Sequence, residues 1–210
     1  MLSAPRLEAV SIAGPAGAIE ASIEPGSDNP PAIAVVCHPH PQHGGTMRNK
    51  VVHTLARTFV TLGATAVRFN FRGVGASEGN YDEGRGELDD ALAVLDWAAE
   101  RWPGTPLWVA GFSFGGWVAL RAAARRTVTQ LVTVAPAVDR FTVDDTDAVS
   151  CPWVLIQGGA DELVSADAVL AWAKQLDHGP EILLMPGVDH FFHGRLTDLK
   201  SRLLESLGES

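Results

Sequence analysis

From residue 32 onward, short apolar segments alternate with longer segments whose apolar residues recur every three to four positions. Ala32–Cys37 and Trp153–Gln157 are examples of the first kind, and Glu87–Trp102 is the clearest example of the second. Short, solidly apolar runs indicate strands buried on both faces, whereas the longer spacing indicates amphipathic helices. Strands that alternate with helices form parallel βαβ units with right-handed crossovers. The sequence therefore predicts an α/β fold, a doubly wound and mostly parallel sheet with helices on both faces.

The same patterns place the individual elements. Two weakly alternating segments, Leu7–Ile12 and Ala18–Ile23, are separated by Gly14-Pro15 and predict a hairpin at one edge of the sheet. The first helix is expected to begin with Thr46 as its N-cap. The predicted strands after the hairpin are Ala32–Cys37, Ala64–Phe71, Leu107–Ala110, Leu131–Ala135, Trp153–Gln157 and Glu181–Met185. The predicted helices are Met47–Leu62, Glu87–Trp102, Gly115–Arg126, Ala166–Leu176 and Leu196–Leu207.

Length and composition limit the class of protein. The chain has 210 residues, of which 46% are hydrophobic and 20% charged, so it can bury a sizeable core. It has no repeat, and its linker-like stretch at residues 25–31 lies too near the N-terminus to separate two domains, so we expect a single domain over residues 1–210. The net charge of −9 argues against a nucleic-acid partner, which would require clustered Lys and Arg.

Cysteine usage and the absence of targeting signals suggest a compartment. Residues 1–10 contain Pro5, Arg6 and Glu8 without a continuous apolar stretch, so we expect no signal peptide. The longest apolar runs are too short to cross a bilayer, so we expect no membrane partner. Cys37 and Cys151 each lie in an apolar run, which favours reduced thiols and a cytoplasmic location, although one disulfide stays open at this point.

One strand-to-helix turn carries a candidate nucleophile. The strand Leu107–Ala110 leads into Gly111-Phe112-Ser113-Phe114-Gly115, which has the form G-x-S-x-G, and a helix follows at once. The glycines allow so sharp a turn that the hydroxyl of Ser113 stands above the sheet at the positive end of the helix. An ordinary glycine-rich turn is the alternative, but the flanking strand and helix favour a nucleophilic serine.

A serine hydroxyl becomes a good nucleophile when a base takes its proton, and that base needs an orienting carboxylate. In doubly wound sheets the active site lies at the carboxyl ends of the strands, so both groups should directly follow later strands. Asp161 follows the strand Trp153–Gln157, and His190 follows the strand Glu181–Met185. We expect Asp161 to orient His190, and His190 to accept the proton of Ser113.

Other acidic residues and histidines compete for these roles. Asp139 follows the strand Leu131–Ala135 and is the main rival acid. Asp189 is too close in sequence for comfortable pairing with its neighbour, while His193 could replace His190 but lies nearer the following helix. His178 stands beside Gly179-Pro180 and indicates a surface turn. The remaining acidic residues, which are typical of a solvated loop, are Asp144, Asp145 and Asp147.

Two backbone amides are expected to form an oxyanion hole for an intermediate on Ser113. The first belongs to Phe114, the residue after the serine, and the second should come from the loop after the strand that ends at Cys37. That loop has the sequence His38-Pro39-His40-Pro41. Because proline has no N–H, His40 is the only donor among residues 39 to 41.

The histidines of this loop, His38, His40 and His43, are also candidate zinc ligands. The alternating prolines hold the side chains in extended directions, and no nearby Cys, Asp or Glu completes a ligand set. We therefore expect no metal and no cofactor, and we expect His38 to lock the loop by hydrogen bonds. The glycine-rich residues 72–79 lack the G-x-G-x-x-G pattern, so we interpret them as a tight loop anchored by Arg72.

Several segments occur together in an order that is typical of one enzyme superfamily. They are His38–Pro41, Gly44–Met47, Asn49–Val52, Arg68–Gly75, Gly111–Gly115 and Asp189–His193. On these residues the chain resembles the α/β-hydrolase superfamily over essentially its whole length, and most closely small, lidless bacterial serine hydrolases akin to the dienelactone hydrolase family. The resemblance implies a catalytic triad of Ser113, Asp161 and His190, with His40 and Phe114 as oxyanion donors. Dienelactone hydrolases proper have a cysteine nucleophile where this chain has Ser113, which speaks against the dienelactone reaction itself.

The resulting hypothesis is a serine hydrolase that cleaves carboxylic esters through an acyl-enzyme on Ser113. Larger relatives insert a lid where this chain has only residues 136–152, so we expect an open site that prefers short to medium acyl chains. The alternatives are a thioesterase, a lactonase, an amidase or peptidase with the same triad, and a non-catalytic binding module. Relatives that cleave peptides usually add a propeller or cap. The expected partner is a small ester substrate, and exposed apolar helix faces at the sheet edge are compatible with a homodimer.

Overall fold

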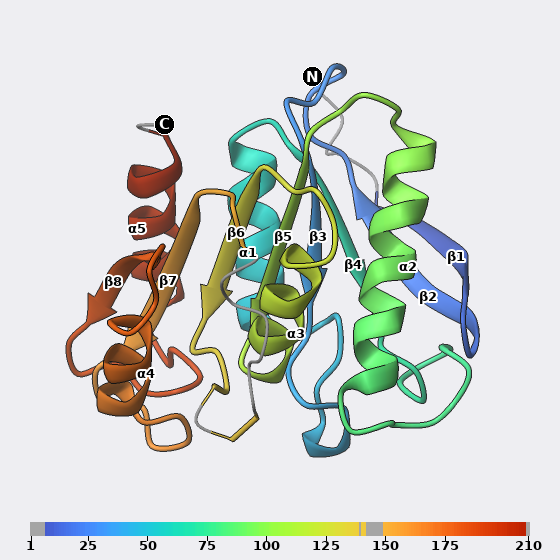
Figure 1. The fold of residues 1–210 in the computed structure, drawn as a ribbon. Coiled ribbons are helices and arrows are strands. Elements are labelled where there is room, and N and C mark those ends of the chain that lie inside the picture. Colours follow the sequence, from blue (N-terminus) through green and yellow to red (C-terminus); the bar gives the residue numbers. More distant parts are fainter. Residues whose placement is uncertain (1–6, 139, 142–148, 209–210) are drawn as a thin grey trace.

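The computed structural model describes residues 7–138, 140–141 and 149–208. Within them, eight strands form one sheet in the order β1-β2-β4-β3-β5-β6-β7-β8 (Figure 1). The antiparallel hairpin of β1 and β2 lies at one edge, and the strands from β4 to β8 are parallel to one another. The strands are β1 (Glu8–Gly14), β2 (Gly17–Glu24), β3 (Ile33–Cys37), β4 (Thr65–Phe69), β5 (Leu107–Phe112), β6 (Gln130–Val134), β7 (Trp153–Gly158) and β8 (Glu181–Met185).

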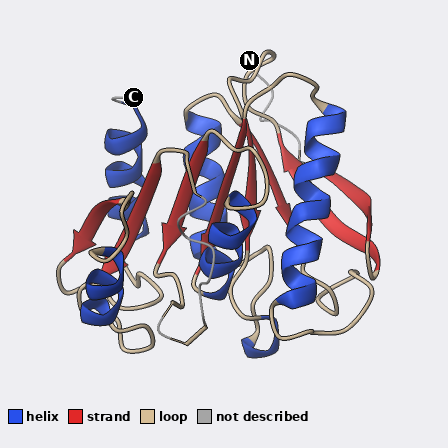
Figure 2. Ribbon diagram, in the orientation of Figure 1, coloured by secondary structure: helices blue, strands red, loops and turns tan. Residues whose placement is uncertain are grey.

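Helices cover both faces of this sheet (Figure 2). On one face α1 and α5 pack on each other and on the sheet, and on the other face lie α2, α3 and α4. The helices are α1 (Lys50–Thr61), α2 (Arg85–Arg101), α3 (Phe114–Ala123), α4 (Ala166–Ala173) and α5 (Leu196–Gly208), with a short 3-10 helix η1 (Pro41–His43). The predicted α/β class, the edge hairpin and the alternation of strands and helices are confirmed.

Strand β3 shows why the sequence folds in this way. All five of its residues are buried. Ile33 and Val35 belong to the hydrophobic core beneath α2 and α3, whereas Ala34 and Val36 belong to the core beneath α1 and α5. Because successive side chains of a strand point to opposite faces, a strand covered on both sides must be apolar at every position.

The start of the first helix differs from the expectation. Helix α1 begins at Lys50, and its N-cap is Asn49, whose side chain accepts from the amides of Val51 and Val52. Thr46 was expected in this role, but its hydroxyl accepts a hydrogen bond from the amide of Arg48 and closes a turn before the helix. The amide of Met47 is bound at 2.8 Å by the Asn70 side chain, which holds that turn outside the helix.

The ends of β5 and α3 differ by a few residues from the predicted ends, because hydrogen bonds to neighbouring segments set them. Strand β5 extends to Phe112, two positions beyond the predicted end at Ala110, because Gly111 and Phe112 pair with Thr133 and Val134 of β6. Helix α3 ends at Ala123, where the amides of residues 125 and 126 turn back to the carbonyl of Ala122. Only Arg121 among the ten residues of α3 escapes burial, as its apolar sequence predicted.

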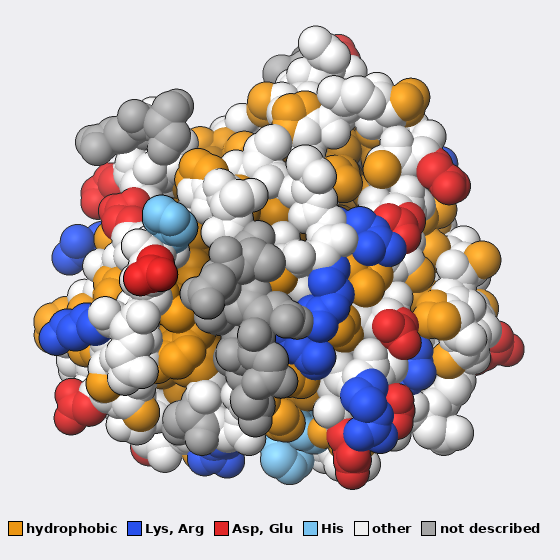
Figure 3. Space-filling model, viewed as in Figure 1, with side chains coloured by type: hydrophobic (Ala, Val, Ile, Leu, Met, Phe, Trp, Pro, Cys, Tyr) orange, Lys and Arg blue, Asp and Glu red, His pale blue; other side chains and the backbone are white. Residues whose placement is uncertain are grey.

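The cysteines, the helices and the surface charges bear on three questions that the sequence raised. Cys37 is buried, Cys151 is half-buried, and both are free thiols, which closes the question of a disulfide between them. Among the described helices, none is long and apolar enough to cross a membrane. Basic and acidic side chains lie intermixed over α2 on the face shown in Figure 3. Among the ion pairs of the described residues, Arg126 pairs with Asp96 of α2, and Arg85 at the start of α2 pairs with Asp82.

Candidate active site

Ser113 stands in the turn between β5 and α3 with a strained backbone. Its φ of 56° and ψ of −119° lie outside the regions that residues with side chains normally occupy. The turn closes only because its flanking positions are glycines: a Cβ on Gly111 would collide with the carbonyl of Gly115, and one on Gly115 would collide with the backbone at Cys37. The amide of Ser113 is bound to the carbonyl of Val134 at 2.8 Å, which fixes the turn to β6.

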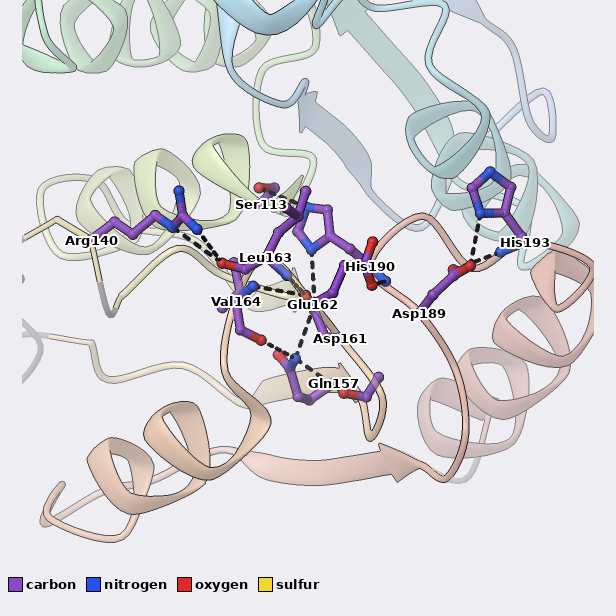
Figure 4. Close-up of polar contacts among 11 residues, drawn as sticks. Ser113, Arg140, Gln157, Asp161, Glu162, Leu163, Val164, Asp189, His190 and His193 are labelled. Carbon is purple, nitrogen blue, oxygen red and sulfur yellow. Dashed lines mark hydrogen bonds and ion pairs between the residues drawn. The ribbon is translucent and has the colours of Figure 1, made fainter.

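His190 and Asp161 come together with Ser113 from three separate loops (Figure 4). The Nε2 atom of His190 lies 3.1 Å from the Ser113 hydroxyl, and its Nδ1 atom lies 2.8 Å from Asp161 Oδ2. An ionised carboxylate accepts but does not donate, so Nδ1 carries the proton and Nε2 presents its lone pair to the serine. This is the arrangement in which imidazole can act as a general base.

Asp161 is held as a carboxylate by four N–H groups. Its Oδ1 accepts from the amides of Leu163 and Val164, and its Oδ2 accepts from Gln157 Nε2 as well as from His190. Burial alone would raise the pKa of this carboxyl, but the hydrogen bonds from His190, Val164 and Leu163 outweigh it and hold the pKa below its usual value. The acid therefore stays ionised and keeps His190 in the required tautomer.

The loop that carries Asp161 is itself tied to its surroundings. Arg140 donates from Nε and Nη2 to the carbonyl of Leu163, at 3.1 and 2.6 Å, and so links the segment after β6 to the acid loop (Figure 4). The carboxylate of Glu162 accepts from the backbone amide of His190 at 3.3 Å. The His190 ring also packs on Phe112, with ring centroids 4.9 Å apart. The imidazole is thus held by contacts from several elements.

The two residues with the expected oxyanion amides adjoin each other beside Ser113. Phe114 is the first residue of α3, and the N–H groups of a first helical turn have no partner inside the helix. No hydrogen bond from the His40 amide to another described residue is present. The rings of His40 and Phe114 lie 5.0 Å apart, so the two residues are neighbours beside Ser113.

His38 makes the hydrogen bonds expected of a loop-locking residue. Its Nδ1 atom is 2.6 Å from the carbonyl of Pro39, and its Nε2 atom accepts from the amide of Phe71 at 3.0 Å. Burial lowers the pKa of His38 to about 4, so the ring is neutral near pH 7. With both nitrogens engaged, His38 has no lone pair left for a metal, and no group of three potential ligands gathers among the described residues.

The side chain of His40 also lies at the site, packed against other aromatic rings. The amide of Gln42 donates to His40 Nδ1 at 3.2 Å, so the proton of the neutral ring is on Nε2, 3.2 Å from the Tyr81 hydroxyl. Burial, and secondarily the nearby His43, lowers the pKa of His40, which favours that neutral form. The ring also faces Phe141 at 6.3 Å, so an aromatic wall borders the oxyanion side.

The rival residues that the structure describes have other partners or positions. Asp189 accepts from the amide and Nδ1 of His193, at 3.0 and 2.8 Å, and this pair is exposed. His178 lies in an exposed turn, as expected. Arg72 anchors its loop by a bidentate pair with the buried Asp90, again as expected. The remaining rival acids, which lie outside the described residues, are Asp139, Asp144, Asp145 and Asp147.

Four residues around the site were not found by sequence reasoning. Gln157 offers the best signal, because it is the single polar side chain in the buried strand β7. Arg140 and Glu162 act through contacts with segments distant in sequence, and Tyr81 is the chain's single tyrosine in an otherwise ordinary loop. No local pattern marks these three.

Comparison with known proteins shows the family. Residues 29–142, more than half of the chain, match the model described as serine aminopeptidase, S33. An uncharacterized protein of Rickettsia prowazekii is 34% identical over 204 residues, covering 92% of this chain and 86% of that protein.

Two solved structures are similar over nearly their whole length. An α/β serine hydrolase homologue from Coxiella burnetii is 43% identical, with a TM-score of 0.92 over 95% of this chain and 97% of that one. An α/β serine hydrolase without lid, from Xanthomonas campestris, is 41% identical, with a TM-score of 0.91 over 100% and 97%. Human mitochondrial palmitoyl-protein thioesterase ABHD10 matches only in part, at 39% identity over 83 residues, 38% of this chain and 26% of that protein.

Proposed function

Because this chain belongs to the α/β-hydrolase family of the serine aminopeptidase S33 model, we propose that it is a serine hydrolase that cleaves small carboxylic esters through an acyl-enzyme on Ser113. The observation that carries this proposal is the continuous hydrogen-bonded chain from the Ser113 hydroxyl through His190 to Asp161. The buried carboxylate of Asp161 and the strained backbone of Ser113 also support the proposal. Both features lower the stability of the fold, and such features are concentrated at catalytic sites.

The proposed reaction assigns one role to each of these groups. As Ser113 Oγ attacks the acyl carbon, its proton passes to His190 Nε2, and Asp161 stabilises the resulting imidazolium. The negative charge on the carbonyl oxygen is taken up by the amides of His40 and Phe114. His190 then returns the proton to the leaving alcohol as the carbon–oxygen bond breaks. Water repeats the sequence on the acyl-enzyme and releases the carboxylic acid.

The preference for short to medium acyl chains is part of the proposal. The connection from β6 to β7 spans only residues 135–152, and the similar Xanthomonas campestris hydrolase is without lid. The half-buried rings of His40, Tyr81 and Phe141, which pack on the buried Phe114, lie on the oxyanion side, where the acyl group of a bound ester would rest. A short open surface of this kind favours small acyl groups over long lipids.

Thioesters are the second candidate substrate class. The partial similarity to the human palmitoyl-protein thioesterase ABHD10 favours it, because the same acyl-enzyme chemistry cleaves a thioester and releases a thiol. Two substrates with the same butyryl group, p-nitrophenyl butyrate and butyryl thiocholine, separate the two classes when their kcat/KM values are compared. An oxygen-ester preference supports the first proposal, and a preference of more than about tenfold, or roughly 1.4 kcal/mol, for the thioester supports the second.

A serine-directed probe tests the proposed chemistry directly. We expect a fluorophosphonate to label the wild-type protein and p-nitrophenyl acetate or butyrate to be hydrolysed, with both lost in Ser113→Ala. Circular dichroism of the variant serves as the control for folding. Folded wild-type protein that neither reacts with the probe nor turns over any ester would overturn the proposal and favour a binding module.

A further inference from the structure

A small cavity lies beside His190, between the start of α1 and the segment that leads into α5. Its volume is about 240 Å³. Its apolar lining comes from Val51, Phe191, Phe192 and Leu196, and the exposed Lys50 and His193 stand at its edge. None of the groups assigned to the proton transfer lines it, so the reaction steps described above leave this cavity unexplained.

The backbone beside the cavity is strained at one residue, and the neighbouring aromatic ring is exposed. Phe192 has a φ of 55° although it is a bulky residue, and its ring is fully buried. This conformation costs on the order of 1–3 kcal/mol. The preceding residue, Phe191, is 42% exposed and is the one exposed phenylalanine among the described residues.

The exposed ring lies directly against the candidate base. The Phe191 ring is 5.1 Å from the His190 ring and 6.4 Å from that of Phe112, centroid to centroid. An apolar side chain of this size is normally buried, since burial is worth about 1.5–3 kcal/mol. Its position next to His190 therefore suits a surface that becomes covered when substrate binds.

We propose that this cavity is the subsite for the alcohol part of the ester, with Phe191 as its wall toward His190. The inference rests on the proposed function. It follows from the path of the proton: the leaving oxygen receives its proton from His190 Nε2 and must lie within about 3 Å of it. In the proposed reaction the carbonyl oxygen binds the amides of His40 and Phe114, whereas the leaving oxygen binds His190. The alcohol therefore extends past His190, toward Phe191 and the cavity.

Size and lining define the class of alcohol. An apolar cavity of about 150 Å³ holds benzene, so the larger volume here accommodates an uncharged group such as benzyl or hexyl. The walls supply mainly apolar contact: the half-buried Asn49 also lines the cavity, but its Oδ1 already accepts from the amides of Val51 and Val52. We therefore assign the subsite to apolar alcohols of about four to seven carbons.

Two acetate esters that differ only in the alcohol test the assignment. With hydrolysis followed by pH-stat, we expect kcat/KM for hexyl acetate to exceed that for ethyl acetate by about tenfold or more in the wild-type protein, equivalent to about 1.4 kcal/mol. In Phe191→Ala the ratio of the two values should fall about tenfold. The matched control is Leu184→Ala, which removes a similarly exposed apolar side chain from β8 and should keep the wild-type ratio.

The ratio separates a subsite from a merely structural role. If Phe191 only positions His190, both esters lose activity equally, the ratio is unchanged and the assignment is wrong. A second variant, Gly194→Asn, tests the cavity without touching Phe191: a Cβ there meets no neighbour, and asparagine tolerates the φ of 67°. Its added amide should also lower the ratio.

The outcomes also separate this inference from the proposed function. Wild-type protein that hydrolyses ethyl and hexyl acetate at equal kcat/KM overturns the subsite and leaves the esterase standing. Wild-type protein that hydrolyses neither ester and resists the fluorophosphonate overturns the esterase, and the subsite with it.

Discussion

Two histidine–aspartate pairs lie close together in sequence and have the same hydrogen-bond length. His190 and Asp161 are 2.8 Å apart, and so are His193 and Asp189. The side chains of the first pair are 3% and 0% exposed, whereas those of the second are 76% and 37% exposed. Identical chemistry at identical distance thus occurs once in the interior and once in solvent.

The partners beyond each pair explain the difference in role. His190 reaches Ser113 with its second nitrogen, and Asp161 receives further hydrogen bonds from Gln157, Leu163 and Val164. The exposed pair is a local link between residues four apart, reinforced by the amide of His193. Exposed ion pairs are typically worth about 0–1 kcal/mol. The contacts of His190 with Ser113 and of Asp161 with its three further donors, and not the histidine–aspartate hydrogen bond itself, therefore distinguish the candidate catalytic pair.

Removing the two histidines in turn should produce the largest contrast. We expect His190→Ala to lower kcat for ester hydrolysis by about 10⁴–10⁶-fold, because among the described residues no other base is hydrogen-bonded to the Ser113 hydroxyl. The kcat of His193→Ala should stay within about twofold of wild type, since its exposed pair with Asp189 contributes little. Steady-state kinetics with p-nitrophenyl butyrate measures both. Comparable losses in the two variants would contradict the assignment of His190 as the base.

Replacing the aspartate of each pair by asparagine should produce the second-largest contrast in kcat. In Asp161→Asn the side-chain amide favours the wrong tautomer of His190, and a change of this kind in a serine protease lowers kcat about 10⁴-fold. Asp189→Asn should remain within about twofold. The same kinetic assay applies, with thermal unfolding to show that both variants fold. An active Asp161→Asn enzyme would shift the acid role to one of the residues outside the described part of the chain.

His38 shows what burial alone does to the pKa of a histidine, because its ring is buried and its hydrogen bonds go to the backbone of Pro39 and Phe71 and not to a carboxylate. Burial lowers its pKa to about 4, so between about pH 6.5 and pH 4 the unfolded chain binds a proton that the folded chain refuses. The free energy of unfolding should therefore fall as the pH falls through this range, by about 3 kcal/mol from this group alone. In His38→Gln, whose amide oxygen can still accept from Phe71, that part of the loss should vanish.

Urea unfolding at pH 6.5, 5 and 4 measures this difference. His178→Gln is the matched control, because it removes an exposed imidazole and should retain the wild-type pH profile. A His38→Gln protein that loses as much stability as wild type between pH 6.5 and pH 4 would show that His38 is not held neutral by burial.

The smallest expected effect on kcat comes from Arg140, which holds the loop that carries Asp161. Arg140→Ala frees the carbonyl of Leu163 and should lower kcat by up to about tenfold, because the amide of the same residue holds Asp161. Arg125→Ala is the control, since that arginine donates to the carbonyl of Arg121 within α3. A change in KM with unaltered kcat would instead indicate that Arg140 acts on substrate binding.

Much of the site could be predicted because its groups directly follow strands. The glycine pattern around Ser113 reflects steric limits within a few residues, and Asp161 and His190 each follow an apolar strand end. The prediction failed at the start of α1, where Thr46 and Asn49 are both good caps by residue type. The hydrogen bond from Met47 to Asn70 of a distant loop decided between them.

The sequence alone determined the fold class, the order of the strands and helices from residue 32, and the serine turn, because hydrophobic period and glycine sterics act over short stretches of chain. Only the tertiary structure decided which histidine–aspartate pair is buried, which side chains support it, and where the cavity beside Phe191 lies. Ser113 and His190 are 77 residues apart. Burial and through-space contact depend on how such distant segments pack, and no local pattern encodes that packing.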